Sequence, residues 1–317
     1  MWNNSLFELF PFFIYLKMRH NSIYGGLQKV THKNIAEEIN MKITEIIRDA
    51  FLFPSKNTGR FAIYLLLSVL MVGFALGGAL TYAYGIINAD NYLAGGVYLI
   101  IAMLIGFIIF GYHIKVIKSG IELDDNVPAF ELYDDFMTGF DNFIVLVAYF
   151  IIPALIVILV GFDTNLFGNA IAVVHELILQ IFSVYIMDGS ISLAIIAISL
   201  ALSDFLNSLA ITITVAIILF VIFSILQLMA EARLANTGSI RGALNIFEAA
   251  KDIIRIGVGK AILLMLLVAV IIAAIEIILM IALTYFPFLL SVIFIIMTPY
   301  LILVTQRALG LLYSDIA

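Results

Sequence analysis

Residues 120–142 carry seven carboxylates and no lysine or arginine, in a chain where only 12% of the residues are charged. A cluster of this kind could bind a divalent cation or place paired acids for proton transfer. Asp124, Asp125, Asp134 and Asp135 are the candidate cation ligands. The stretch lacks the regular one-three-five spacing of oxygen ligands in a calcium loop. We therefore favour a solvated acidic face over a metal site, and we predict no metal.

The same stretch has the pattern of an amphipathic helix. On a helical wheel, the acids lie mainly away from a broad apolar face formed by Phe130, Tyr133, Phe136, Met137 and Phe140. This pattern is typical of a helix that lies in the membrane interface. An acidic helix should bind a basic partner, a cation or the protein's own basic segment 241–260. The candidate docking residues are Asp134, Asp135, Arg241, Lys251 and Arg255.

Glu276 is the second candidate, because it lies well inside an apolar segment. A charged group at the centre of a span costs about 2.5–3.5 kcal/mol, so such residues usually face a polar interior or are protonated. Glu276 could couple transport to a proton or cation. It could equally be a neutral carboxyl group that forms a hydrogen bond with a neighbouring helix.

His175-Glu176 is the third candidate. Zinc peptidases of the helical type need two histidines one helical turn apart, and Gln180 stands where the second would be. We therefore interpret His175 and Glu176 as part of a polar stripe on an outer hairpin, or as part of a cavity shared with Glu276.

Composition excludes several other classes of protein. The chain has 317 residues, of which 64% are hydrophobic, so it is a membrane protein rather than a soluble one. Cysteine is absent, which excludes disulfides, thiolate metal sites and cysteine nucleophiles. A net charge of −6 argues against nucleic acid as a partner. No nucleophile or paired-acid pattern stands out, so we lean against an enzyme and predict no cofactor.

These candidates must be positioned by membrane-spanning helices of about 20 apolar residues each. We predict an all-α polytopic fold with spans at Phe61–Ile86, Tyr92–Tyr112, Phe143–Gly161, Ala210–Ala230, Ala261–Tyr285 and Phe288–Val304. The apolar region between the third and fourth spans is broken at residues 187–190. Its halves, Asn169–Tyr185 and Ile191–Leu206, form an outer helical hairpin, or two further crossings that would give eight spans.

Lysine and arginine flank the spans on one side only, which by the positive-inside rule is the cytoplasmic side. We predict a multi-pass protein of the cell membrane with both termini in the cytoplasm and amphipathic helices on that side. The membrane domain covers residues 41–317. Residues 1–40 are an N-terminal extension, either interfacial or outside the core.

The segments on the basic side indicate a threefold internal repeat. A Phe-Glu pair followed by a glycine and then a span occurs at Phe130 and at Phe247. Upstream of each pair, at Lys115 and Arg233, a basic residue lies five positions before a glycine. The segment from Glu45 takes the same place before the first span. The predicted units are residues 41–120, 128–238 and 245–313.

The same residues resemble an uncharacterised, mainly archaeal membrane protein family, domain of unknown function 4013. The resemblance runs from Met41 to Tyr313. It depends on the segments "RDAFLFPSKN", "GYHIKVIKSG" followed by "VPAF", "EARLANTGSIRGALNIFEAAKDIIRIGVGK" and "RALGLLY". It implies a polytopic membrane protein without an assigned activity.

The leading hypothesis is a non-enzymatic membrane scaffold or accessory component that contacts lipid and other membrane or cytoplasmic proteins. The alternative is a small-solute or ion transporter that uses Glu276 as an intramembrane carboxylate.

Overall fold

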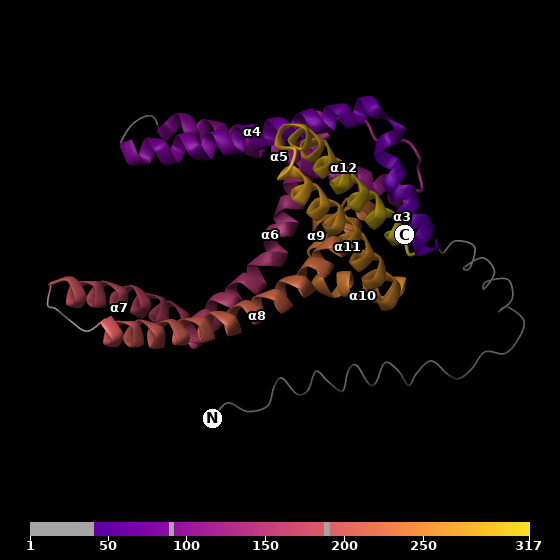
Figure 1. The fold of residues 1–317 in the computed structure, drawn as a ribbon. Helices are drawn as coiled ribbons and strands as arrows, with labels where there is room; N and C mark the ends of the chain where they lie inside the picture. Colours follow the sequence, from indigo (N-terminus) through magenta and orange to yellow (C-terminus); the bar gives the residue numbers. More distant parts are fainter. Residues whose placement is uncertain (1–40, 89–91, 187–190) are drawn as a thin grey trace, which may run out of the picture. The chain divides into compact units, whose positions relative to one another are not determined.

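The computed structural model describes residues 41–88, 92–186 and 191–317, and the predicted extension 1–40 lies outside these residues. The described residues form helices and no strand (Figure 1). The elements are α3 (Ile43–Leu52), the 3₁₀ turn η1 (Phe53–Lys56), α4 (Thr58–Asn88), α5 (Tyr92–Ile121), α6 (Leu132–Asp163), α7 (Leu166–Ile186), α8 (Ile191–Thr237), α9 (Ile240–Ala243), α10 (Ile246–Ile256), α11 (Val258–Leu283) and α12 (Pro287–Tyr313).

Seven of the described helices are long and apolar enough to cross a membrane, namely α4, α5, α6, α7, α8, α11 and α12. The fold is therefore an all-α polytopic membrane fold, as predicted. The seventh helix is α7, which corresponds to the first half of the expected outer hairpin. The predicted break at residues 187–190 lies outside the described residues.

The second half of the expected hairpin is not a separate element. It continues into the fourth predicted span as α8, one helix of 47 residues. Its sequence contains no proline or glycine, so nothing ends the helix between the two predicted pieces. The hydroxyl group of Thr212 donates to the Ser208 carbonyl at 2.8 Å, one turn back, and so is satisfied within the helix. α7 packs against α8 (Figure 1).

The acidic stretch also differs from expectation, because its helical part is not a separate in-plane helix. It is the first turns of α6, which runs without a break into the third predicted span. The counterpart α10 is separate from its span α11. Asn245 caps its start by accepting from the Glu248 amide at 3.3 Å, and Gly257, with a φ of 103°, ends it.

Buried apolar side chains gather at the C-terminal ends of α5, α8 and α12, where α3 and α10 pack against them. We call this region the charged end, because Lys115, Arg233 and Arg307 lie in it. α5 is central and packs against α4, α6, α8 and α12.

Glycines allow the helices to approach α5 closely. At the crossing of α5 and α6, a Cβ atom on Gly139 would overlap the Phe107 carbonyl, and one on Gly111 would overlap the Asp135 backbone. At the crossing of α5 and α12, Gly120 faces Gly310 in the same way. Close packing of small residues is the usual means by which spanning helices associate.

Candidate functional site

The acidic stretch is divided among different partners in the structure. Asp125 lies in the loop before α6, and its Oδ1 atom is 2.6 Å from Lys56 Nζ. Asp135 lies in the first turns of α6 and forms an ion pair with Lys115 at 2.7 Å. Among the described residues, no three histidine or carboxylate side chains are grouped so that they could hold a metal ion.

The orientation of α6 also differs from the predicted amphipathic face. Asp135, expected on the solvated acidic face, is fully buried in the protein, whereas Tyr133 of the predicted apolar face is 72% exposed. The reason is the close glycine crossing, which brings the Asp135 backbone against Gly111 and lets its carboxylate reach Lys115. Tyr133 is thus left to face the surroundings of the protein, and Asp134 is exposed beside it.

Three ion pairs connect the predicted repeat units at the charged end, and we call them the clasp pairs. They are Lys115–Asp135 at 2.7 Å, Arg233–Asp252 at 2.7 Å and Arg307–Asp49 at 2.8 Å. In each pair the base lies near the end of a unit's last helix, and the acid lies in the amphipathic segment that opens the next unit. The third pair connects the last unit back to the first, so the pairs form a closed cycle.

A sequence signal for this cycle exists. Each clasp aspartate lies four residues after a glutamate, in the pairs Glu45/Asp49, Glu131/Asp135 and Glu248/Asp252. Two of these glutamates also contact the clasp base, since Lys115 lies 2.7 Å from Glu131 and Arg233 lies 3.7 Å from Glu248. The repeat predicted from the sequence aligned the Phe-Glu pairs and the glycines but did not extend to the aspartates.

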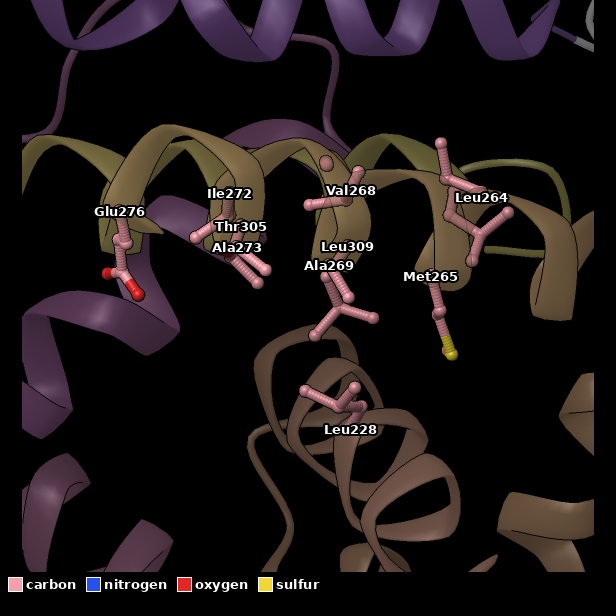
Figure 2. Close-up of a pocket in the computed structure, with 12 residues that line it drawn as sticks. Leu228, Leu264, Met265, Val268, Ala269, Ile272, Ala273, Glu276, Thr305 and Leu309 are labelled. Atoms are coloured by element: carbon pink, nitrogen blue, oxygen red, sulfur yellow. The ribbon is translucent and has the colours of Figure 1, made fainter. Parts of the chain in front are cut away.

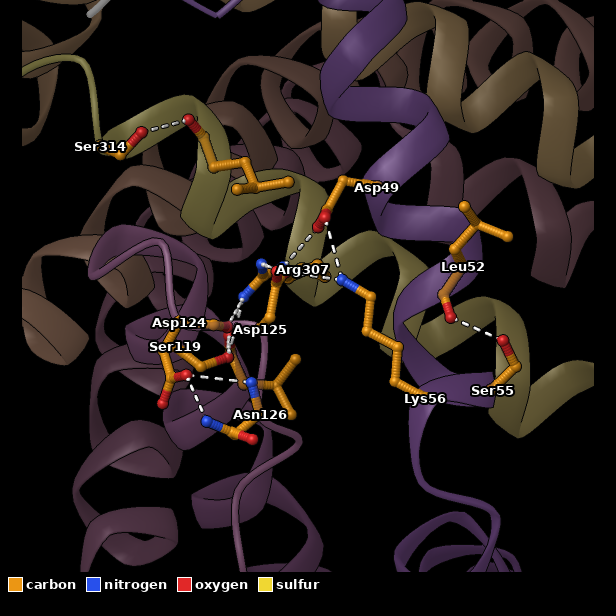
Figure 3. Close-up of polar contacts among 12 residues, drawn as sticks. Asp49, Leu52, Ser55, Lys56, Ser119, Asp124, Asp125, Asn126, Arg307 and Ser314 are labelled. Atoms are coloured by element: carbon orange, nitrogen blue, oxygen red, sulfur yellow. Dashed lines mark hydrogen bonds and ion pairs between the residues drawn. The ribbon is translucent and has the colours of Figure 1, made fainter.

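Arg307 is the most buried of the three bases, with 1% of the residue exposed. Figure 3 shows its polar contacts. Its Nε atom donates to Asp49, and its Nη1 atom donates to the Asp124 carbonyl at 2.7 Å and to Ser119 Oγ at 3.3 Å. Its guanidinium also lies 4.4 Å from the centre of the Phe53 ring, in the range of a cation–π contact. Arg307 therefore joins α12 to α3, η1, α5 and the loop after α5.

Lys56 lies beside this site and pairs with Asp49 at 3.1 Å as well as with Asp125. Burial acts to lower the pKa of Lys56, but its hydrogen bonds to Asp125 and Asp49 outweigh this and raise the pKa above 10.5. The hydrogen bond and the charge of Lys56 hold the pKa of Asp125 below its ordinary value of 3.8. The pair is therefore intact over a wide pH range.

We expect the loop before α6 to loosen in acid. The folded pKa of Asp125 is lowered, so the stabilisation is present above pH 3.8 and is lost as the pH falls through the folded pKa. A spin label on Ala129→Cys should become more mobile only as the pH falls below 3.8 and through the folded pKa of Asp125. In Asp125→Asn the label should already be mobile at neutral pH, with little further change. Equal mobility of the two proteins at neutral pH would contradict this role.

Glu231 lies at the end of a predicted span, a position that would place its carboxyl group among lipid headgroups. In the structure this carboxyl group is buried. It accepts from Asn142 Nδ2 at 3.1 Å, so it links α8 to α6. Arg233, two positions further along α8, pairs with Asp252 at 2.7 Å. The two residues lie on different faces of α8 because they are two positions apart.

Glu276 lies at one end of a groove of about 380 Å³ between α8, α11 and α12 (Figure 2). The other lining side chains are apolar except for Thr305, and Leu228, Val268 and Leu309 are typical of them. Glu276 is partly exposed and has no hydrogen bond or ion pair to another described residue. The groove is thus lined almost entirely by apolar side chains, with the Glu276 carboxyl group at one end.

His175 and Glu176 lie on α7, away from Glu276. His175 is exposed, and Glu176 accepts from Gln180 Nε2 at 3.2 Å. The groove at Glu276 is lined by α8, α11 and α12, with no residue of α7. His175 and Glu176 thus lie on α7, outside the groove that Glu276 lines.

The remaining candidate residues belong to α9 and α10. Arg241 is exposed on α9, Lys251 pairs with Glu248 at 2.6 Å, and Arg255 pairs with Asp252 at 3.0 Å. The basic segment 241–260 therefore satisfies its own acids, while Asp135 pairs with α5. The structure does not bring the acidic and basic segments together through ion pairs among the described residues.

Long apolar helices that are joined at one end by ion pairs form the architecture of a polytopic α-helical membrane protein. The chain belongs to the family described as "Protein of unknown function (DUF4013)", whose model matches residues 94–285. This match begins within α5 and ends just after α11, and it confirms the family that the sequence motifs indicated. No curated protein and no solved structure gives a significant match.

Proposed function

We propose that the protein is a non-enzymatic membrane scaffold or accessory component whose charged end faces the cytoplasm. The basic residues at this end favour the cytoplasmic side. Its buried ionisable groups are occupied in holding the helices together, as the clasp pairs Lys115–Asp135 and Arg307–Asp49 illustrate. A closed cycle of ion pairs holds the helices in one arrangement, as a protein that offers a fixed binding surface to partners requires.

The observation that carries this proposal is the contrast between two neighbouring acids of α6. Asp135 is fully buried and paired, whereas Asp134 is exposed and has no ion pair with another described residue. The clasp thus fixes the start of α6 and holds the Asp134 carboxylate outward. A carboxylate held in this way complements a basic segment of a partner protein, where charge contributes to specificity and to the rate of association.

The alternative, a transporter that uses Glu276, lacks comparable support. The groove beside Glu276 is lined almost entirely by apolar side chains. A transported polar solute would need partners along its path to replace its hydration.

We expect Asp134→Lys to release proteins that co-purify with the tagged protein from native membranes, measured by quantitative mass spectrometry. The folded state should be unchanged, because Asp134 is exposed and outside the clasp. Glu122→Lys is the matched control, since Glu122 is an exposed acid in the turn that follows α5. Loss of the same proteins in both variants, or in neither, would count against a docking role for Asp134.

A further inference from the structure

The outward face of α10 combines apolar and basic side chains. Phe247 is 80% exposed and Ile254 is 59% exposed. Lys251 lies four positions after Phe247 and Arg255 lies eight positions after it, and the two basic side chains are 58% and 57% exposed. Positions i, i+4, i+7 and i+8 share one face of a helix, so two apolar anchors and two cations point outward together.

The acids of α10 point the other way. Asp252, of which 1% of the side chain is exposed, pairs with Arg233 and accepts from the Tyr313 hydroxyl at 2.8 Å. Glu248 is mostly covered and lies between Lys251 and Arg233. Lys251 and Arg255 reach these carboxylates, at 2.6 and 3.0 Å, but more than half of each basic side chain remains exposed. Arg241, exposed on the adjacent α9, adds a third cation.

The connections of α10 keep it near the membrane surface. It follows α8 after the short helix α9, and it precedes α11 directly, and both α8 and α11 have the length and composition of membrane spans. Gly257, whose φ of 103° favours glycine, separates α10 from α11 and lets the two helices take different directions. α10 can therefore lie across the end of the span rather than extend it.

We propose that the outward face of α10 is a docking site for the headgroups of anionic phospholipids, with Phe247 and Ile254 inserted at the acyl boundary. Helices with aromatic and aliphatic side chains beside lysine and arginine bind such surfaces. The position that Lys251 takes in α10 is taken by Asp134 in α6 and by Arg48 in α3, so α10, where Lys251 is joined by Arg255 and by Arg241 of α9, has a charge that fits an anionic leaflet and α6 does not. This inference deepens the proposed function, because it rests on the placement of the charged end at the cytoplasmic surface.

The absence of cysteine allows a direct test. A nitroxide on Phe247→Cys replaces one apolar side chain by another and reports its surroundings through collisions with oxygen or with a water-soluble nickel chelate. The full chain is placed in nanodiscs of phosphatidylcholine, either alone or with phosphatidylglycerol as the minority lipid. The label should become more accessible to oxygen and less accessible to nickel in the anionic discs. Added salt should reduce this difference.

Neutralising the three cations by Arg241→Gln, Lys251→Gln and Arg255→Gln should remove the response to anionic lipid. We expect a loss of about fivefold in the ratio of docked to undocked helix for each cation removed. Arg48→Gln, which removes an exposed cation of α3, is the matched control and should leave the response intact. The exchange of Lys251→Arg with Arg255→Lys keeps the charge and should also retain it. This second variant keeps the test decisive if the neutralised protein does not fold.

Two results would overturn the inference. One is a label that is equally accessible to nickel in both kinds of disc. The other is a label that is protected in native membranes but not in anionic discs, which would mean that a protein covers α10. Neither result depends on Asp134, so failure of lipid docking and failure of the proposed partner docking can be told apart.

Discussion

Replacing Gly139 by alanine should destabilise the protein by about 3 kcal/mol, although alanine is the better helix former. The added Cβ atom would overlap the Phe107 carbonyl and lie too close to the Gly111 amide, and both are backbone atoms that cannot turn away. α5 and α6 would have to separate, which would also lengthen the Lys115–Asp135 pair. The loss should appear as a lower melting temperature in detergent, followed by circular dichroism.

A second glycine of α5 gives the matched control. A Cβ atom added to Gly96 would meet nothing within 4 Å, so Gly96→Ala should leave stability unchanged or raise it by up to about 1 kcal/mol. Gly111→Ala meets the same crossing from the other side and should behave like Gly139→Ala. If Gly139→Ala and Gly96→Ala melted at the same temperature, the close crossing would not exist in solution.

Replacing Arg307 by methionine should cost about 3–5 kcal/mol, the range for removing one partner of a buried ion pair. The change leaves the Asp124 carbonyl and Ser119 without their donor, and it opens the only clasp pair that connects the last predicted unit to the first within the described chain. Hydrogen exchange should show the loss locally, as faster exchange in α3. The Tyr300 hydroxyl still donates to the Phe51 carbonyl, so we expect α3 to loosen rather than detach.

Lys251→Met is the control for Arg307→Met. It also removes one ion pair, with Glu248 at 2.6 Å, but on an exposed side chain, and such pairs contribute about 1 kcal/mol or less. An equal loss of stability in both variants would show that the burial of Arg307 does not strengthen its ion pair. Unchanged exchange in α3 of Arg307→Met would show that the cycle is not closed by this pair.

The sequence was sufficient for the elements that depend on hydrophobicity and length. The apolar segments predicted at Phe61–Ile86 and Tyr92–Tyr112 lie within α4 and α5, because an apolar run of about 20 residues satisfies its own backbone in lipid only as a helix. The prediction of two separate helices was wrong where it depended on a weakly polar stretch to end the first of them. Ile191–Leu206 joined Ala210–Ala230, because a weakly polar stretch without proline or glycine does not end a helix.

The candidate site was harder to predict, because tertiary contacts decided it. A helical wheel treats Asp134 and Asp135 alike, and only the glycine crossing with α5 determines that Asp135 is the buried one. The clasp partners Arg307 and Asp49 lie at opposite ends of the membrane domain, so no local pattern indicates their contact. The position of Glu276 in an apolar segment is plain from the sequence, but the groove beside it is formed by three helices and cannot be deduced from one.

The length of α8 has a consequence for the surrounding bilayer. At about 1.5 Å per residue, its 47 residues extend about 70 Å, whereas the 26 residues of α11 extend about 39 Å. Hydrocarbon about 30 Å thick would cover the whole of α11 at about 40° from the membrane normal, but the whole of α8 only at about 65°. α7, which packs against α8, is also apolar and has no buried residue in its apolar window, so placing the pair in water would expose apolar surface. The chain therefore combines helices whose lengths suit the hydrocarbon thickness to different degrees, and the thickness of a bilayer should influence how well the protein fits it.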